Sequence, residues 1–395
     1  MKNDSKRVTI NLMISQALYL SAMSIDLTIT ALVGALLSGN KIFATLPIAL
    51  ISILSVVVAP QIPRIANLIG LKLVLQIGGF IAAIGGICSW YSLNVHSFIF
   101  LCIGTSCVGI YQAVANYYRY VASDVSRGHE VKSISLIMSA GVLAAIIGPM
   151  LATWASDTFN PLYSGAYLVV SVLGLTAVIS NSFLPKVAVD ETIQSSKQNT
   201  NDSQIKISLF SLLKRSAFRN GVLILICSCF SMALIMSGAP IIMQSVLHNT
   251  PAQRMVGMQL HMVGMYLPVF ILLFVSKYIP IKIQILIGLT VGFFAAFASA
   301  FTVNNFSVTL TLLLIGICWS LCYTSGSALL TKSYTPEERQ SARGKGELFP
   351  VLGLAIGGLL AGPFSKWVTW NDQMIIVLIL ILISLLMIIF DWKRI

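Results

Sequence analysis

The chain has 395 residues, of which 57% are hydrophobic and only 10% are charged, and its mean hydropathy is +0.88. This composition is typical of an integral membrane protein and excludes an ordinary soluble domain. The formal net charge is +12, so the basic residues need an explanation of their own.

Apolar runs of about 20 residues are long enough to cross the hydrocarbon core of a bilayer. Six such runs lie near residues 8–36, 42–62, 71–92, 97–121, 133–154 and 161–184. Six more lie near residues 219–246, 255–277, 281–302, 306–330, 346–368 and 373–391. The stretch between the two sets is polar and rich in Gln, Ser, Thr and Asn, as in a flexible linker. We therefore predict a six-helix bundle over 1–185, a cytoplasmic linker over 186–218 and a second six-helix bundle over 219–395.

The basic residues fall mainly on one side of the predicted membrane. If both termini are cytoplasmic, only Lys41, Arg254 and Lys366 of the 25 Lys and Arg residues lie on the outer side. The positive-inside rule therefore predicts cytoplasmic termini. Topology accounts for the net charge, and no nucleic-acid partner is expected.

The two halves share sequence features at matching places. Gly109-Ile110 in the fourth run corresponds to Gly316-Ile317 in the tenth, and Gly148-Pro149 in the fifth corresponds to Gly362-Pro363 in the eleventh. Six plus six spans with parallel repeats is the organisation of the major facilitator superfamily. We expect an all-α membrane protein of twelve transmembrane helices, in two bundles related by pseudo-two-fold symmetry, with a substrate site near the bilayer midplane and transport by alternating access.

Methionines are concentrated in the seventh and eighth spans. Met232 and Met236 are four residues apart in one span, and His261 and Met265 are four apart in the next. Residues at this spacing are neighbours on a helix, so each pair is able to hold one ion between two side chains. Thioether sulfur and imidazole nitrogen suit Cu(I) better than Mg²⁺ or Ca²⁺. Methionine also fills gaps in helix packing, and packing is our interpretation of Met243, Met258 and Met262.

These two signatures and their surroundings resemble the CcoA-like copper importers of bacterial inner membranes, which carry M-x-x-x-M on the seventh helix and H-x-x-x-M on the eighth. The stretches that carry the resemblance are 232–243, 261–268, 118–124, 132–135, 329–331 and 334–339, together with Gly148-Pro149. The loop between the second and third spans departs from the superfamily pattern, because Asn67 stands where an acid is expected.

The resemblance implies a secondary transporter of the bacterial inner membrane that imports copper, with Met232, Met236, His261 and Met265 as ligands. Copper is then the substrate, no cofactor is expected, and cytoplasmic copper-accepting chaperones are possible partners. The same wider family includes riboflavin importers, so import of riboflavin or a similar organic solute is an alternative. Trp319, Tyr323, Tyr118 and Tyr266 are then stacking surfaces and His261 is a hydrogen-bonding group. Proton-coupled drug efflux is a further alternative.

Two other membrane residues carry chemistry. Cys229 lies three residues before Met232 on the same predicted helix face, so it is an auxiliary metal ligand candidate. Asp26 lies near the middle of the first span, where an ionised carboxylate costs on the order of 3 kcal/mol on insertion scales. We predict that Asp26 takes and releases a coupling proton; the alternative is a carboxyl held by a hydrogen bond between helices.

Charged residues at the cytoplasmic helix ends suggest a gate. Arg119 and Asp124 lie at the cytoplasmic end of the fourth span, and Arg339 lies in the equivalent loop of the second half beside Glu337 and Glu338. Pairing among them would close the cytoplasmic side, whereas solvated ion pairs are the ordinary alternative. Neither a phosphate-binding loop nor a metalloprotease or hydrolase motif is present, so the sequence predicts no enzyme.

Overall fold

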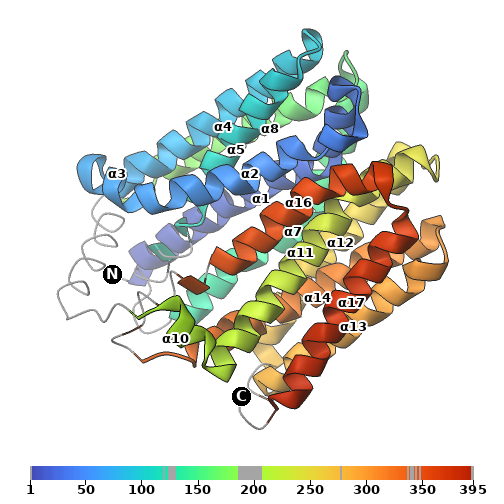
Figure 1. Cartoon of the computed structure of the whole chain (residues 1–395). Helices are drawn as coiled ribbons and strands as arrows, with labels where there is room; N and C mark the ends of the chain where they lie inside the picture. Colours follow the sequence, from blue (N-terminus) through green and yellow to red (C-terminus); the bar gives the residue numbers. More distant parts are fainter. Residues whose placement is uncertain are drawn as a thin grey trace. The chain divides into compact units, whose positions relative to one another are not determined.

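The structure is a computed structural model, and it describes residues 2–118, 121–122, 130–185, 207–275, 278–335, 338, 342, 345–346 and 348–392. These residues are helical almost throughout, as Figure 1 shows. Within them, twelve helical segments are long and apolar enough to cross a membrane, from Arg7–Ser38 to Trp370–Phe390. The prediction of an all-α fold with twelve transmembrane helices is confirmed.

The chain divides into two compact units, Met1–Asn199 and Thr200–Ile395. The helices of the first unit are α1 (Lys2–Ser38), α2 (Leu46–Val58), α3 (Ile62–Ile69), α4 (Leu71–Asn94), α5 (Phe98–Ala115), α7 (Glu130–Thr158) and α8 (Ser164–Ser182), with short 3₁₀ turns at Lys41–Phe43 and Ala59–Gln61. The helices of the second unit are α10 (Leu209–Leu213), α11 (Ser216–Ser245), α12 (Pro251–Val275), α13 (Ile281–Phe301), α14 (Asn305–Thr331), α16 (Leu348–Trp367) and α17 (Trp370–Phe390).

The segment predicted as a linker, 186–218, is described only from residue 207. That part contains the short helix α10 and the first residues of α11. Residues 186–206 lie outside the described residues, so the linker stays a prediction.

The second span is longer than its apolar run. The sequence predicts a span over 42–62, whereas the helical segment runs over Lys41–Ile69 through α2, a 3₁₀ turn and α3. Pro60 and Pro63 do not stop it, because each lies in the first turn of its own short helix, where no intrahelical N–H bond is lost. The chain turns only at Gly70, whose positive φ of 87° suits a residue without a Cβ.

The same pattern of helix packing occurs in each unit. In the first unit α1 packs on α7, α2 on α5, and α4 on both α5 and α8. In the second unit α11 packs on α16, α12 on α14, and α13 on both α14 and α17. Counted as membrane spans, the first span of each unit therefore packs on the fifth, the second on the fourth, and the third on the fourth and sixth. This agrees with the repeat of the Gly-Ile and Gly-Pro pairs along the sequence.

Candidate functional site

His261 is fixed between two helices of the second unit. It lies on α12 with no exposed surface, and its Nδ1 is 2.8 Å from the carbonyl oxygen of Leu312 on α14. A carbonyl oxygen only accepts hydrogen bonds, so Nδ1 carries a proton and donates it to this contact. The other ring nitrogen, Nε2, has no hydrogen-bond partner among the described residues. In a neutral ring, Nε2 therefore presents a free lone pair.

Two glycines allow α12 and α14 to meet at the H-x-x-x-M signature. A Cβ at Gly316 of α14 would lie 2.5 Å from the carbonyl oxygen of His261 and 3.1 Å from the backbone nitrogen of Met265. A Cβ at Gly264 of α12 would lie 2.4 Å from the carbonyl oxygen of Leu313. Such close backbone approach is possible only without side chains, as in other membrane helix pairs. The contact between the helices is therefore centred on the signature itself.

The soft side chains of α11 lie on a helix that packs mainly on α16 and α14. Met232, Met236 and Cys229 are all buried. The contact between α11 and α12 is slight, and there Met243 meets Gly257, with its methyl carbon 3.0 Å from a Cβ placed on that glycine. Met243 belongs to the hydrophobic core of the unit. The described contacts join Met232 and Met236 neither to His261 nor to Met265, so a four-ligand site stays a prediction.

An aromatic pair begins on α14 about two turns beyond Leu312, the residue that binds His261. The rings of Trp319 and Tyr323 are stacked, with centroids 5.0 Å apart and planes 24° from parallel, and both side chains are half-buried. The indole Nε1 of Trp319 donates to the Sγ of Cys229, 3.4 Å away. Cys229, predicted as an auxiliary metal ligand, here accepts a hydrogen bond that orients Trp319.

The other two aromatic residues predicted as stacking surfaces are Tyr118 and Tyr266. Tyr118 is buried in the first unit, where its hydroxyl accepts from the side chain of Asn181 at 3.0 Å. Asn181 also accepts from Ser15 of α1 and donates to the carbonyl of Leu75 on α4. Tyr118 is thus part of a buried network that ties helices together. Tyr266 lies on α12, half-buried.

Asp26 is a buried carboxylate of the first unit. Its side chain is 1% exposed, and its Oδ1 accepts a hydrogen bond from the Thr30 hydroxyl at 3.2 Å. The Thr30 oxygen is in turn 3.1 Å from the hydroxyl of Tyr167 on α8. The second carboxylate oxygen, Oδ2, has no partner among the described residues. Sequence reasoning missed Thr30 and Tyr167; Thr30 was detectable one helical turn after Asp26, whereas Tyr167 required the packing of α1 on α8.

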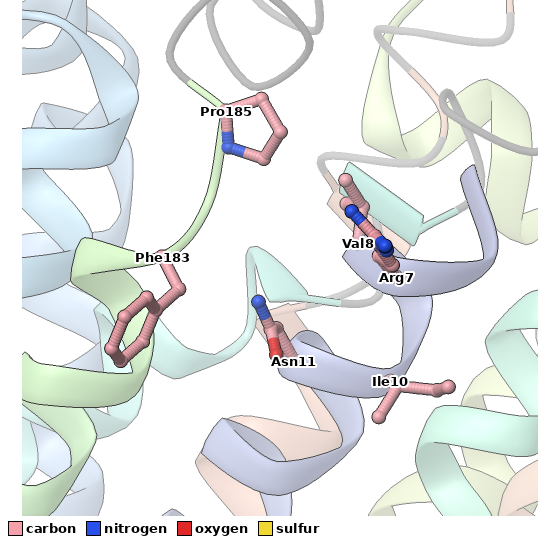
Figure 2. A pocket seen from close by; sticks show the side chains of 6 residues that line it. All are labelled: Arg7, Val8, Ile10, Asn11, Phe183 and Pro185. Carbon is pink, nitrogen blue, oxygen red and sulfur yellow. The ribbon is translucent and has the colours of Figure 1, made fainter. Parts of the chain in front are cut away.

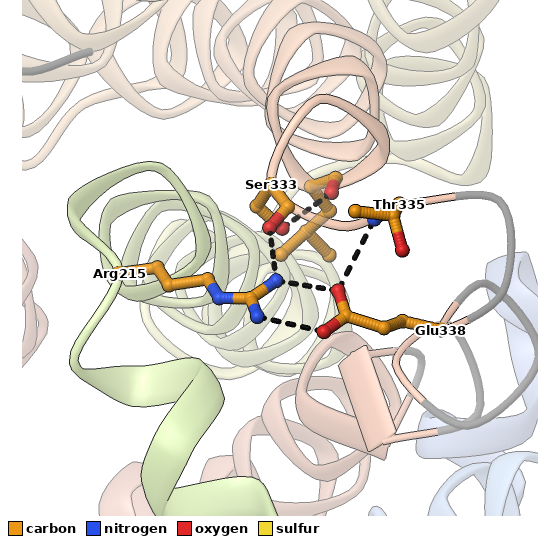
Figure 3. Close-up of polar contacts among 5 residues, drawn as sticks. Arg215, Ser333, Thr335 and Glu338 are labelled. Atoms are coloured by element: carbon orange, nitrogen blue, oxygen red, sulfur yellow. Dashed lines mark hydrogen bonds and ion pairs between the residues drawn. The ribbon is translucent and has the colours of Figure 1, made fainter. Parts of the chain in front are cut away.

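The predicted gate residues Arg119, Asp124 and Arg339 lie outside the described residues. Their neighbour Glu338 forms a two-pronged ion pair with Arg215, the residue before α11, at 2.6 and 2.8 Å (Figure 3). Arg215 also donates to the carbonyl of Ser333 at 2.8 Å, and Glu338 accepts from the backbone N–H of Thr335 at 3.1 Å. The hydrogen bonds from Arg215, followed by that from Thr335, lower the pKa of Glu338 to about 2. Sequence reasoning did not foresee this partner.

A surface pocket of about 420 Å³ lies at one end of the first unit (Figure 2). Arg7, Val8, Ile10 and Asn11 of α1 line it with Phe183 and Pro185, which follow α8. Arg7 and Asp26 are 19 residues apart on one helix, which corresponds to about 28 Å. The pocket is therefore separate from the buried carboxylate.

Comparisons with known proteins show the family to which the chain belongs. The family model for the Major Facilitator Superfamily matches residues 12–345. The chain belongs to this superfamily. It is a multi-pass secondary transporter and not an enzyme.

Two relatives cover nearly its whole length. The chain is 28% identical to the riboflavin transporter RfnT of Brucella anthropi, over 97% of this chain and 96% of that protein. It is 23% identical to the uncharacterized MFS-type transporter YdeG of Bacillus subtilis, over 90% of this chain and 85% of that one. The crystal structure of the nucleoside transporter NupG superposes with a TM-score of 0.67 at 17% identity, covering 98% of each chain, and so supports the fold.

Proposed function

We propose that this transporter imports riboflavin or a similar planar organic solute by alternating access across a bacterial inner membrane, with both termini cytoplasmic. The observation that carries the proposal is the alignment, over 97% of the chain, with a riboflavin transporter. This was the alternative to copper in the sequence interpretation, and it now has the better support.

The second unit contains side chains suited to such a solute. Aromatic rings favour offset stacking, so the half-buried Trp319–Tyr323 pair suits the flat ring system of a flavin. The indole N–H of Trp319 is already bound to Cys229, so Trp319 offers its ring face rather than its polar edge. The unpartnered Nε2 of His261 supplies a hydrogen-bonding group on the neighbouring helix.

Copper is the second candidate, because one observation favours it. Histidines that bind metals usually donate their other ring N–H to a carbonyl or carboxylate, as His261 does to Leu312. Against copper, the Met232–Met236 pair lies on a helix in slight contact with α12, and neither of the relatives described above is named as a copper carrier. Copper import and copper-accepting chaperones therefore rank below the organic solute.

Asp26 is our candidate for proton coupling. A carboxyl group at this depth is costly when ionised, and α1, α5, α7 and α8 place no described Lys, Arg or His beside it. A bound proton removes that cost. The unpartnered Oδ2 is the oxygen that this proton would occupy, while Oδ1 keeps its bond from Thr30.

The decisive experiment is riboflavin uptake by a bacterial riboflavin auxotroph that expresses the chain. Growth on low external riboflavin and accumulation of labelled riboflavin above empty vector are expected. Trp319→Ala should reduce uptake about tenfold, the loss that corresponds to one base-stacking contact of about 1–3 kcal/mol. Trp367→Ala is the matched control, because Trp367 is 67% exposed on α16.

Labelled copper provides the opposing test in the same cells. If the chain accumulates copper but not riboflavin, and Met236→Ala abolishes that accumulation, the copper hypothesis replaces the proposal. If riboflavin accumulates, and cells with the wild type or with Met236→Ala contain no more copper than cells with empty vector, the proposal stands.

A further inference from the structure

The Nε2 atom of His261 is held in a fixed position from which it is able to bind a solute. The other ring nitrogen, Nδ1, is bound to Leu312 of α14, and Gly264 and Gly316 meet beside this bond and keep α12 and α14 in close contact. The ring is therefore fixed in both position and tautomer. A buried polar atom that lacks a partner among the described residues is costly, so the unpaired lone pair of Nε2 calls for a hydrogen-bond donor.

The imidazole is best described as neutral. Helices α11, α12 and α14 contain no Asp or Glu, so none of the three supplies a counter-charge for an imidazolium inside the membrane. A neutral ring with its proton on Nδ1 offers Nε2 purely as an acceptor. A solute that meets this atom must bring an N–H or O–H.

Leu312, which anchors the His261 ring, and the aromatic pair lie along one face of α14. At about 100° per residue, Leu312, Gly316, Trp319 and Tyr323 fall within an arc of about 60°. Leu312 holds the His261 ring and Trp319 lies seven residues further, a rise of about 10 Å. A fused three-ring heterocycle has the length to stack near Trp319 at one end and to reach Nε2 with the other.

We propose that His261 is a specificity-determining residue whose Nε2 accepts a hydrogen bond from a ring N–H that lies between two carbonyls, as in the imide edge of a flavin. The inference rests on the proposed function and narrows it. The solute class is planar heterocycles with an imide N–H, and the Trp319–Tyr323 pair binds their ring face while His261 selects their edge.

The test compares riboflavin with N3-methylriboflavin, in which a methyl group replaces the imide hydrogen. In wild type, the KM for uptake of the methylated analogue should be about tenfold higher or more, because the buried Nε2 is left unpaired. His261→Asn and His261→Phe should both bring the ratio of the two KM values close to one. They should do so mainly by raising the KM for riboflavin.

The two variants separate hydrogen bonding from size. Asn keeps a donor for Leu312 but leaves more space, whereas Phe fills the space without an acceptor. If His261→Phe keeps the wild-type ratio, the discrimination is steric and the inference is overturned. His248→Asn is the control, because His248 is exposed after α11 and its φ of 52° is tolerated by Asn. It should keep the wild-type ratio.

The comparison of the two compounds in wild type needs no variant, so it tests the inference even if the His261 variants fold poorly. Riboflavin uptake with equal KM values for the two compounds overturns this inference and leaves the proposed function intact. Absence of riboflavin uptake overturns both.

Discussion

The two units share one pattern of helix packing but differ in part of the polar chemistry that they bury. The described part of the first unit encloses hydroxyls, an amide and the carboxylate of Asp26, joined in the chain Asp26, Thr30, Tyr167 and in the network around Asn181. The second also buries hydroxyls, amides and a carboxylate, that of Asp391, which is bound by Arg219 and Asn220. In addition it encloses thioethers, a thiol acceptor and an imidazole beside a stacked aromatic pair. The pattern of packing thus leaves the choice of buried chemistry open. This difference suggests a division of labour, with coupling in the first unit and solute recognition in the second.

The strongest test of that division is Asp26→Asn. One proton moving down a gradient of one pH unit supplies about 1.4 kcal/mol, which corresponds to about tenfold accumulation. If Asp26 carries that proton, the variant should lose this tenfold component while still exchanging internal for external riboflavin. Uptake and exchange in vesicles with imposed pH gradients measure both.

Asp372→Asn is the control for this experiment, because Asp372 lies exposed in the first turn of α17, beside Thr369. Undiminished gradient-driven uptake by Asp26→Asn would remove coupling from the first unit and favour a purely structural carboxyl.

A smaller effect is expected from Gly316→Ala, which tests whether close helix packing holds the recognition site of the second unit. The new Cβ would lie 2.5 Å from the carbonyl oxygen of His261, and overpacking of this kind costs about 1–3 kcal/mol. The melting temperature in detergent should fall, and the KM for riboflavin should rise.

Gly238→Ala provides the comparison, because its Cβ would lie 3.7 Å from the side-chain oxygen of Gln373, an ordinary contact. This change in α11 should alter stability by no more than about 1 kcal/mol. Equal melting temperatures for the two variants would show that α12 and α14 separate without cost.

The smallest effect concerns Glu338→Gln, outside the membrane. The folded-state pKa of Glu338, about 2, lies below its ordinary value of 4.5. The ion pair with Arg215 therefore stabilises the folded protein above pH 4.5, and this contribution is lost as the pH falls toward 2. Wild type should melt slightly above the variant at pH 7, and the two melting temperatures should converge in acid. A difference that is constant with pH would contradict the assignment.

Much of the architecture follows from sequence, because each membrane span can be predicted from the residues of that span alone. Twelve apolar runs predict twelve spans, since a membrane helix satisfies its own backbone and needs only length and hydropathy. The exception is instructive. The second span continues through Pro60 and Pro63 to Ile69, because proline at the start of a helical turn costs no hydrogen bond.

The candidate site was only partly predictable. Asp26 and His261 could be identified because ionisable residues are rare in apolar helices, and helical periodicity identified the methionine stripes. It did not show that α12 packs on α14, that Leu312 fixes the tautomer of His261, or that Cys229 binds Trp319. Those facts depend on contacts between residues up to 90 positions apart.

By itself, the sequence determined that this protein crosses the membrane twelve times in two related halves, because hydropathy, charge and spacing act locally along the chain. Only the tertiary structure decided which side chains contact one another. Helix faces meet through small residues such as Gly264 and Gly316. Among the described residues, helix packing leaves one nitrogen of His261 and one oxygen of Asp26 without a partner. Long-range packing, and not local pattern, selects the atoms that remain free to bind.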